Sequence, residues 1–205
     1  MVLADGGSSD TTVALYHALT RSWEARGRTP RSVDCPRAGR ATQMNMGARV
    51  ATGKILLFLH ADTLLPPNAT HVLIQALADP GILAGGFRHS FTETGLFLRV
   101  ISSWATARSR LTGIHLGDQA MFVRRSVFEA MGGFPEIPLF EDLHLSRALR
   151  ARGRVVTLPL SVATSARRLR QGGMLRTGLR FAWLQLRHAL GADPGGPKNE
   201  YPDVR

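Results

Sequence analysis

The chain has 205 residues, 44% of them hydrophobic and 20% charged, which is enough to bury the core of one large domain and excludes a disordered or fibrous protein. Lys and Arg number 26 against 15 for Asp and Glu, and the resulting charge of +11 favours polyanionic partners such as nucleotide diphosphates, nucleic acid or an anionic bilayer. The single cysteine, Cys35, excludes a disulfide within the chain and favours a reducing compartment.

Helix-like and strand-like patterns alternate along the chain. Apolar residues that recur at a period of about 3.6 predict helices, and short apolar runs bounded by polar residues predict strands. The predicted elements in chain order are strand 2–4, helix 11–26, helix 39–52, strand 55–59, a helix starting at Pro66, strand 82–91, helix 95–111, strand 119–125, helix 126–131, helix 141–152, strand 154–160 and helix 173–190. A basic, proline-containing link separates the first two helices.

This alternation predicts an α/β fold with layers of helices on a largely parallel sheet. We expect a single domain over residues 1–190 and a flexible Pro/Gly-rich tail over 191–205. Within the strand at 82–91, Gly85 and Gly86 indicate a close approach of backbone. The start of the chain lacks the pattern of a signal peptide, and its longest apolar run, 55–59, is too short to cross a bilayer, so a cytoplasmic location is expected.

Two aspartates follow predicted strands. Asp5 ends the first strand, and Asp62 follows the apolar run K-I-L-L-F-L-H. Ligands of open α/β sheets bind at the carboxyl ends of the strands. Each aspartate alone is more typical of a turn or helix cap, whereas the two together favour a functional site. Mg²⁺ and Mn²⁺ are commonly held by one or two carboxylates together with substrate phosphates, so Asp62 and a diphosphate would meet that need.

Six segments in order and spacing resemble the family 2 glycosyltransferases of the GT-A fold. They are D-G-G-S-S-D, G-R-A-T-Q-M-N-M-G, L-L-F-L-H-A-D-T-L-L-P, G-D-Q-A-M-F-V-R-R, G-G-F-P-E-I-P-L-F-E-D and S-A-R-R-L-R. The resemblance covers residues 2–190 and is greatest to a small bacterial branch with an H-A-D variant of the DxD motif. It implies a three-layer GT-A-like fold with a mostly parallel mixed sheet, and transfer of a sugar from a nucleotide-diphosphate donor to a hydroxyl acceptor.

The same resemblance implies a donor pocket. Asp5, with Gly6 beside it, would contact the nucleobase or ribose, and Arg40 and Asn45 would line the same pocket. As the start of a helix, Arg40 is also typical of a solvated charge.

Asp62 resembles the last aspartate of the DxD motif and would bind Mn²⁺ or Mg²⁺. His60 stands where many relatives have an aspartate, and a neutral imidazole suits Mn²⁺ better than Mg²⁺. A strand-end histidine is also a common structural hydrogen-bonding group.

Glu141 and Asp142 open a predicted helix, where carboxylates also stabilise the positive end of the helix dipole. The resemblance implies that Asp142 is the general base of an inverting reaction, with Glu141 as the second candidate. A fixed carboxylate within hydrogen-bond reach of the acceptor hydroxyl is sufficient for that role.

Two further segments resemble substrate-binding parts of the family. Asp118 and Gln119 would face the acceptor, although a turn before a strand is the alternative. Arg167 and Arg168 would contact the donor diphosphate, as in the Q-x-x-R-W element of processive relatives, whose glutamine and tryptophan are missing here.

The predicted helix 173–190 is basic and amphipathic. It predicts either peripheral contact with an anionic membrane or packing on the sheet with its arginines in water. A lipid or a glycan is the expected acceptor, and nucleic acid is not an expected partner.

Relatives normally have a further strand and helix before D-G-G-S-S-D, whereas only four residues precede Asp5 here. Either the start of the protein lies upstream of this sequence or the first strand and helix are missing, and we expect donor binding to be impaired in this short form. Three alternatives remain open, namely a nucleotidyltransferase, a truncated inactive relative, and a basic module that binds membranes or nucleic acid.

Overall fold

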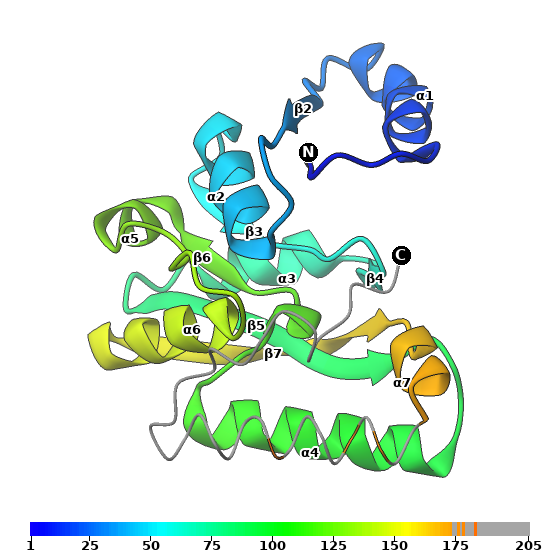
Figure 1. Cartoon of the computed structure of the whole chain (residues 1–205). Coiled ribbons are helices and arrows are strands. Elements are labelled where there is room, and N and C mark those ends of the chain that lie inside the picture. Colours follow the sequence, from blue (N-terminus) through cyan, green and yellow to red (C-terminus); the bar gives the residue numbers. More distant parts are fainter. Residues whose placement is uncertain (174–175, 177, 179–182, 184–205) are drawn as a thin grey trace. The chain divides into compact units, whose positions relative to one another are not determined.

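The structure is a computed structural model that describes residues 1–173, 176, 178 and 183 (Figure 1). It divides into two compact units. Unit 1 comprises Met1–Leu56 with Val123–Ile137, and unit 2 comprises Leu57–Phe122 with Pro138–Arg205. The single domain expected over 1–190 stays a prediction, and the tail 191–205 and most of the predicted helix 173–190 lie outside the described residues.

Unit 1 is built on two short parallel strands. Its elements are β1 (Val2–Asp5), α1 (Thr12–Glu24), β2 (Arg31–Asp34), α2 (Arg40–Val50) and α5 (Arg125–Ala130). The buried Tyr16 of α1 donates its hydroxyl to the carbonyl of Arg31 at 2.7 Å and lies 3.1 Å from that of Met1. One side chain therefore holds the starts of both strands together.

Arg125 fixes α5 to the end of α2 within unit 1. Its guanidinium donates to the carbonyls of Ala48, Ala51 and Gly53 at 3.1, 2.7 and 2.7 Å. These carbonyls lie at and beyond the end of a helix, where intrahelical donors are lacking. The arginine thus satisfies acceptors that the helix itself leaves without partners.

The larger sheet has five strands in the order β3-β6-β5-β7-β4. They are β3 (Ile55–Leu57), β6 (Phe122–Arg124), β5 (Ile82–Phe91), β7 (Arg154–Thr164) and β4 (Thr63–Leu64). β5 and β7 pair in parallel, whereas β4 is antiparallel to β7. The sheet is therefore mixed, as expected, and β3 and β6 contain points at which the chain passes from one unit to the other.

Helices complete unit 2. They are α3 (Ala69–Ala76), α4 (Leu96–Thr112), the short 3-10 helix η1 (Gly117–Gln119), α6 (Glu141–Arg152) and α7 (Arg167–Gln171). The core includes Phe87, Phe122, Val162 and Leu149, all of which are fully buried. No helix among the described residues has the length and apolar character needed to span a bilayer.

The close backbone approach predicted at Gly85 and Gly86 is confirmed. A Cβ atom on Gly85 would lie on the carbonyl oxygen of Val156, and one on Gly86 would lie 2.5 Å from the His115 ring. The pairing of β5 with β7 also shifts register between Phe87 and Arg88, opposite Pro159, which has no N–H to donate.

Several local expectations differ from the structure, among them the predicted strand 119–125, of which Gln119 belongs to η1 and only Phe122–Arg124 form β6. The link before α2 contains the strand β2, and a second unpredicted strand, β4, follows the H-A-D segment. β7 is longer than the predicted 154–160 and continues to Thr164. There the hydroxyl of Thr63 donates a hydrogen bond to that of Thr164 at 3.1 Å. Both missed strands are short and are defined by pairing with distant partners rather than by local pattern.

Candidate functional site

Asp142 lies at the start of α6, in contact with the G-D-Q segment. Its Oδ2 accepts the backbone N–H of Gly117 at 2.7 Å, and its Oδ1 accepts that of Leu143 at 2.7 Å. The side chain is 8% exposed and neighbouring Glu141 is 2% exposed. Asp142 is thus held in one position, with a small accessible portion, at the start of a helix.

His60 also lies against this glycine. A Cβ atom on Gly117 would lie 2.5 Å from both Cε1 and Nε2 of His60 and 3.3 Å from Oδ2 of Asp142. The histidine of H-A-D and the aspartate of E-D therefore meet at Gly117 within unit 2. Their proximity requires a residue without a side chain at that position.

We predict that Gly117→Ala displaces the imidazole of His60 while the fold is retained. The backbone of Gly117 does not adopt a positive φ, and the obstructing atoms are the tip of a side chain that can rotate. Binding of Mn²⁺ with a nucleoside diphosphate should weaken by about tenfold. Isothermal titration calorimetry of the variant measures this change.

The matched control is Gly81→Ala, because its added Cβ would meet the carboxylate of Asp79, well away from His60 in sequence. Unchanged metal-dependent binding in Gly117→Ala, with a normal thermal unfolding curve, would contradict a role for His60 at the metal.

The S-A-R-R segment lies against H-A-D. The N–H of Ser165 donates to the carbonyl of Asp62 at 3.0 Å, and the Ser165 hydroxyl accepts the N–H of Arg167 at 3.2 Å. The side chains of Asp62 and Arg167 are both exposed. Arg168 follows Arg167 in α7. The backbone of Asp62, a candidate metal ligand, is therefore hydrogen-bonded to the segment that carries the two predicted diphosphate contacts.

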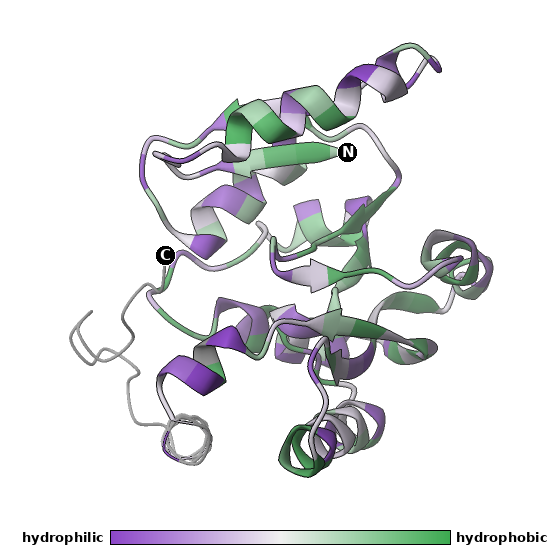
Figure 2. Ribbon diagram, turned by 90° about the vertical axis from the view of Figure 1, so that its right-hand side faces the viewer, coloured by the Kyte–Doolittle hydropathy of each residue, from purple (hydrophilic) through white to green (hydrophobic). Residues whose placement is uncertain are grey.

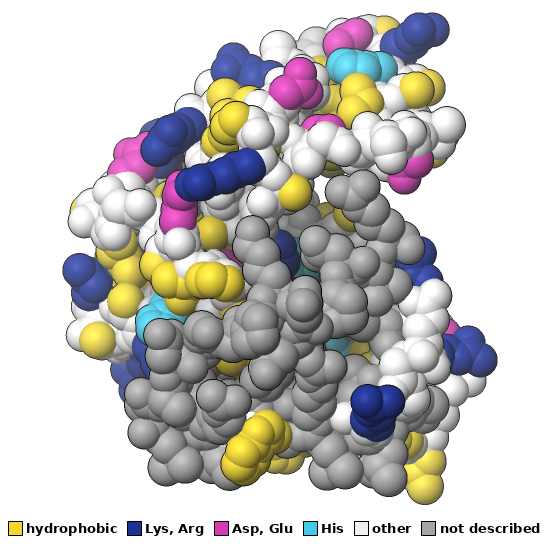
Figure 3. Space-filling model, in the orientation of Figure 1, with side chains coloured by type: hydrophobic (Ala, Val, Ile, Leu, Met, Phe, Trp, Pro, Cys, Tyr) yellow, Lys and Arg dark blue, Asp and Glu magenta, His cyan; other side chains and the backbone are white. Residues whose placement is uncertain are grey.

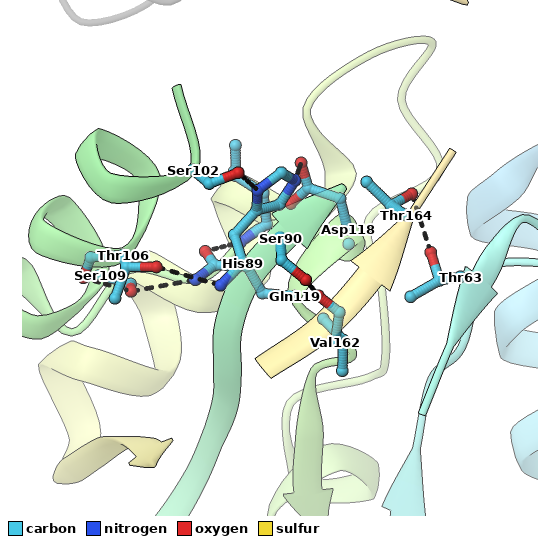
Figure 4. Close-up of polar contacts among 12 residues, drawn as sticks. Thr63, His89, Ser90, Ser102, Thr106, Ser109, Asp118, Gln119, Val162 and Thr164 are labelled. Atoms are coloured by element: carbon cyan, nitrogen blue, oxygen red, sulfur yellow. Dashed lines mark hydrogen bonds and ion pairs between the residues drawn. The ribbon is translucent and has the colours of Figure 1, made fainter. Parts of the chain in front are cut away.

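Asp118 and Gln119 have different environments (Figure 4). Oδ2 of Asp118 lies 3.5 Å from Nε2 of the buried His89, and the Asp118 side chain is 41% exposed. Gln119 is fully buried, and its amide donates to the Phe87 carbonyl and to the Ser109 hydroxyl at 3.0 Å each. Asp118 is therefore accessible to a substrate, whereas the Gln119 amide positions the segment from inside the core.

His89 completes this arrangement. Its Nδ1 lies 3.0 Å from the hydroxyl of Ser102, and burial lowers the pKa of His89, an effect partly opposed by the negative charge of Asp118. A neutral ring can accept from Ser102 and donate toward Asp118. The sequence showed only an isolated histidine in a strand and gave no signal for this role.

His115 predicts a pH dependence of stability. The ring is fully buried with Nε2 at 2.9 Å from the Thr157 hydroxyl, and burial lowers the pKa of His115 to about 4. Because the unfolded chain binds a proton near pH 6.5 and the folded chain does not, stability falls as the pH drops from about 6.5 toward 4. Urea unfolding should show a loss of about 2 kcal/mol between pH 7 and pH 5 from this group.

His115→Gln should reduce that slope, while His71→Gln, on the exposed side of α3, should leave it unchanged. The window above pH 5 avoids protonation of Asp5, whose folded pKa is lowered. An identical slope in the His115 variant would contradict the prediction.

The predicted donor-pocket residues lie in unit 1. Asp5 is 8% exposed and accepts from the Ser8 hydroxyl and from the N–H groups of Ser8 and Gly7, and these bonds lower its pKa. Gly6 lies against the side chain of Gln43, since an added Cβ would be 2.9 Å from it. Asp5 is therefore ionised and organises the D-G-G-S turn.

Asn45 and Arg40 lie on α2. Asn45 accepts the N–H of Phe134 and donates to its carbonyl, at 2.9 Å each, so it anchors the G-G-F-P segment within unit 1. Arg40 is the exposed first residue of the helix. Nucleotide contacts by Asp5, Gly6, Arg40 and Asn45 stay predictions, as does their convergence with Asp62 and Asp142.

The described residues contain no cluster of three or more His, Cys, Asp or Glu side chains placed to hold a metal ion. Within H-A-D, His60 offers an imidazole and Asp62 an exposed carboxylate. Two such donors fit a divalent ion whose remaining ligands are substrate phosphates and water.

The comparisons with known proteins agree with this architecture. The sequence model described as glycosyl transferase family 2 matches residues 1–132, which include the G-D-Q segment and end before Glu141. Among curated proteins, none gives a significant match.

Solved glycosyltransferases have similar structures. The mannosyltransferase PcManGT from Pyrobaculum calidifontis, in complex with GDP-Man and Mn²⁺, matches with a TM-score of 0.62 and 25% identity over 90% of this chain and 51% of that one. Glucosyl-3-phosphoglycerate synthase from Mycobacterium tuberculosis, in complex with phosphoglyceric acid, matches with a TM-score of 0.63 and 18% identity over 95% and 70%. GalNAc-T7 with UDP, GalNAc and Mn²⁺ matches with a TM-score of 0.58 and 15% identity over 80% and 37%.

The chain thus spans about half the length of the mannosyltransferase. The fold is the mixed α/β fold of the GT-A glycosyltransferases. With a family match over 132 of 205 residues and this fold, the chain belongs to glycosyl transferase family 2.

Proposed function

We propose that the protein is an inverting, metal-dependent glycosyltransferase that moves a sugar from a nucleotide-diphosphate donor to a hydroxyl acceptor, either a lipid or a glycan. The observation that carries this proposal is that His60 and Asp142 both lie against Gly117, while Asp62, two residues after His60, is hydrogen-bonded through its carbonyl to Ser165. Three segments with the residue types for metal, base and acceptor binding thus lie together in unit 2. The H-A-D sequence as a DxD variant, and a place in a small bacterial branch, belong to the same proposal.

Asp142 would accept the proton of the acceptor hydroxyl as its oxygen attacks the anomeric carbon. The bond from that carbon to the diphosphate breaks on the opposite face, so the configuration inverts. Asp142 suits this role because two backbone N–H groups fix its position and a carboxylate oxygen keeps lone pairs for a further hydrogen bond. Asp118, partly exposed and supported by His89, would orient the acceptor hydroxyl.

Asp62 and His60 would hold Mn²⁺ or Mg²⁺, which supplies charge stabilisation for the departing diphosphate. PcManGT and GalNAc-T7 were both solved with Mn²⁺ and a nucleotide ligand, which supports this assignment. Arg167 and Arg168 would bind the same diphosphate from the turn at Ser165. Electrostatic groups placed in advance around a leaving group lower the barrier without later reorganisation.

The direct test is a panel of nucleotide sugars incubated with the protein and Mn²⁺ or Mg²⁺, scored for release of the nucleoside diphosphate. We expect release from one donor that stops when EDTA removes the metal. If no nucleotide sugar or nucleoside diphosphate binds, the transferase proposal fails and the basic binding module is favoured. Binding without release in the presence of lipid and glycan acceptors would instead favour an inactive relative.

A further inference from the structure

Helix α4 carries apolar residues on two opposite faces. Its inner face, with Leu98 and Ala105, is buried in unit 2. The opposite face, here called the outer stripe, consists of Leu96, Val100, Trp104, Ala107 and Leu111. The exposed fractions of Leu96, Val100, Trp104 and Leu111 are 78%, 59%, 58% and 87%.

Spacings of three and four residues keep the outer stripe on one side of the helix. A helix on the surface of a soluble domain normally has polar residues there. Figure 2, in which α4 is seen nearly end-on, shows green, hydrophobic segments on this helix. A continuous row of exposed large side chains is typical of an interaction surface, whereas single exposed ones are common.

The charged residues of α4 itself are all positive. α4 contains no Asp or Glu, and its Arg99 and Arg110 are exposed. Trp104 lies under the guanidinium of Arg108, which is 5.5 Å from the ring centroid. Figure 3 shows further Lys and Arg side chains on the described part of one face, together with Asp and Glu side chains.

We infer that the outer stripe of α4 docks on an anionic lipid bilayer. Apolar side chains, a tryptophan and flanking arginines on one helix face are the combination that binds at the interface of such membranes. A second copy of the chain fits less well, because each copy carries +11. One row of five side chains also offers much less than the roughly 800 Å² per partner of a stable dimer.

The start of α4 lies near the proposed site. Glu93, three residues before Leu96, accepts the N–H of Ala166 through Oε2 at 2.8 Å, and the preceding Ser165 donates to the carbonyl of Asp62. Contact of α4 with a bilayer would thus bring lipid head groups toward H-A-D. This consequence rests on the proposed function, whereas the docking itself does not.

The test is sedimentation of the full chain with vesicles of phosphatidylcholine, with and without phosphatidylglycerol. We expect binding to the anionic vesicles only, weakened by salt. Trp104→Ser combined with Leu111→Ser should reduce the partition coefficient by about tenfold or more. The matched control, Leu64→Ser with Ile74→Ser, removes two exposed apolar side chains of unit 2 outside α4 and should bind as the wild type does.

A second readout follows Trp104 alone in a Trp23→Phe, Trp183→Phe background. Its fluorescence should shift to shorter wavelength with anionic vesicles. The inference is overturned if the chain does not bind anionic vesicles. It is also overturned if the α4 double variant and the control double variant lose vesicle binding equally. It is also overturned if the substitutions in α4 instead abolish a dimer seen by analytical ultracentrifugation. Because none of these readouts uses a nucleotide, failure here and failure of the proposed transfer are separate results.

Discussion

Replacement of Asp142 by Asn should lower the rate of sugar transfer by about a hundredfold to ten-thousandfold, with the affinity for the nucleoside diphosphate retained. Asn has nearly the same shape, yet it cannot accept the proton of the acceptor hydroxyl. The donor is bound by other residues in the proposal, so its dissociation constant should change little. Single-turnover transfer and calorimetric titration of the nucleotide measure the two quantities separately.

Asp142 also has a structural role, since its carboxylate accepts hydrogen bonds from the N–H groups of Gly117 and Leu143. An amide offers one acceptor atom for these two donors, so the variant should lose about 1–3 kcal/mol of stability. Gly117→Ala crowds the same contact and leaves the carboxylate in place, and because it also displaces His60, the two variants are compared at Mn²⁺ and donor concentrations that saturate both. If Gly117→Ala and Asp142→Asn lose transfer equally, Asp142 acts by position and the base assignment is wrong.

Glu141→Gln distinguishes the catalytic roles proposed for the two neighbouring carboxylates, Glu141 and Asp142. Glu141 is more deeply buried than Asp142, so an acceptor reaches it less easily. A greater loss of transfer in Glu141→Gln than in Asp142→Asn, at equal stability, would exchange their proposed roles.

Helices were predictable where the sequence contains both a helical period of apolar residues and capping residues at the two ends. α6 runs from Glu141 to Arg152 as expected, because carboxylates open it and Gly153 follows it. The period of α4 was equally clear, yet its recurring residues, including Leu96 and Trp104, face outward. A sequence period identifies which residues share a face, but it does not show what covers that face.

The elements that depend on distant partners could not be predicted. β2 has a single apolar residue, Val33, and its parallel pairing with β1 is supported by the Tyr16 hydroxyl from α1. The contact of His89 with Asp118 likewise joins a strand to a later turn. Such contacts form only when the core is packed, so the local sequence pattern does not predict them.

The part of the site that was predicted came from motif resemblance rather than from period or charge. The segments H-A-D, G-D-Q and E-D indicated which residue types belong together, and the structure brings His60, Gly117 and Asp142 into contact. Roles for single residues are less transferable, since Gln119 turns inward to the core. A motif therefore predicts which segments lie together better than it predicts the contacts of each member.

Asp62→Ala should weaken Mn²⁺-dependent binding of a nucleoside diphosphate by about a hundredfold or more, because loss of even an indirect partner of a metal costs tenfold to a hundredfold. The fold should remain intact, since the side chain is exposed and the hydrogen bond to Ser165 uses the backbone carbonyl, which alanine keeps. Calorimetry with and without Mn²⁺ isolates the metal-dependent part of the binding free energy.

Glu24→Ala, which removes an exposed carboxylate at the end of α1, is the control for the change in net charge and should bind as the wild type does. A comparison with Gly117→Ala then distinguishes the two candidate ligands. If both His60 and Asp62 hold the ion, each variant should weaken binding in Mn²⁺ and neither should alter the residual binding in EDTA. If Asp62→Ala lowers affinity equally in Mn²⁺ and in EDTA, the carboxylate contacts the nucleotide without a metal, and the assignment of H-A-D as a metal motif fails while nucleotide binding stands.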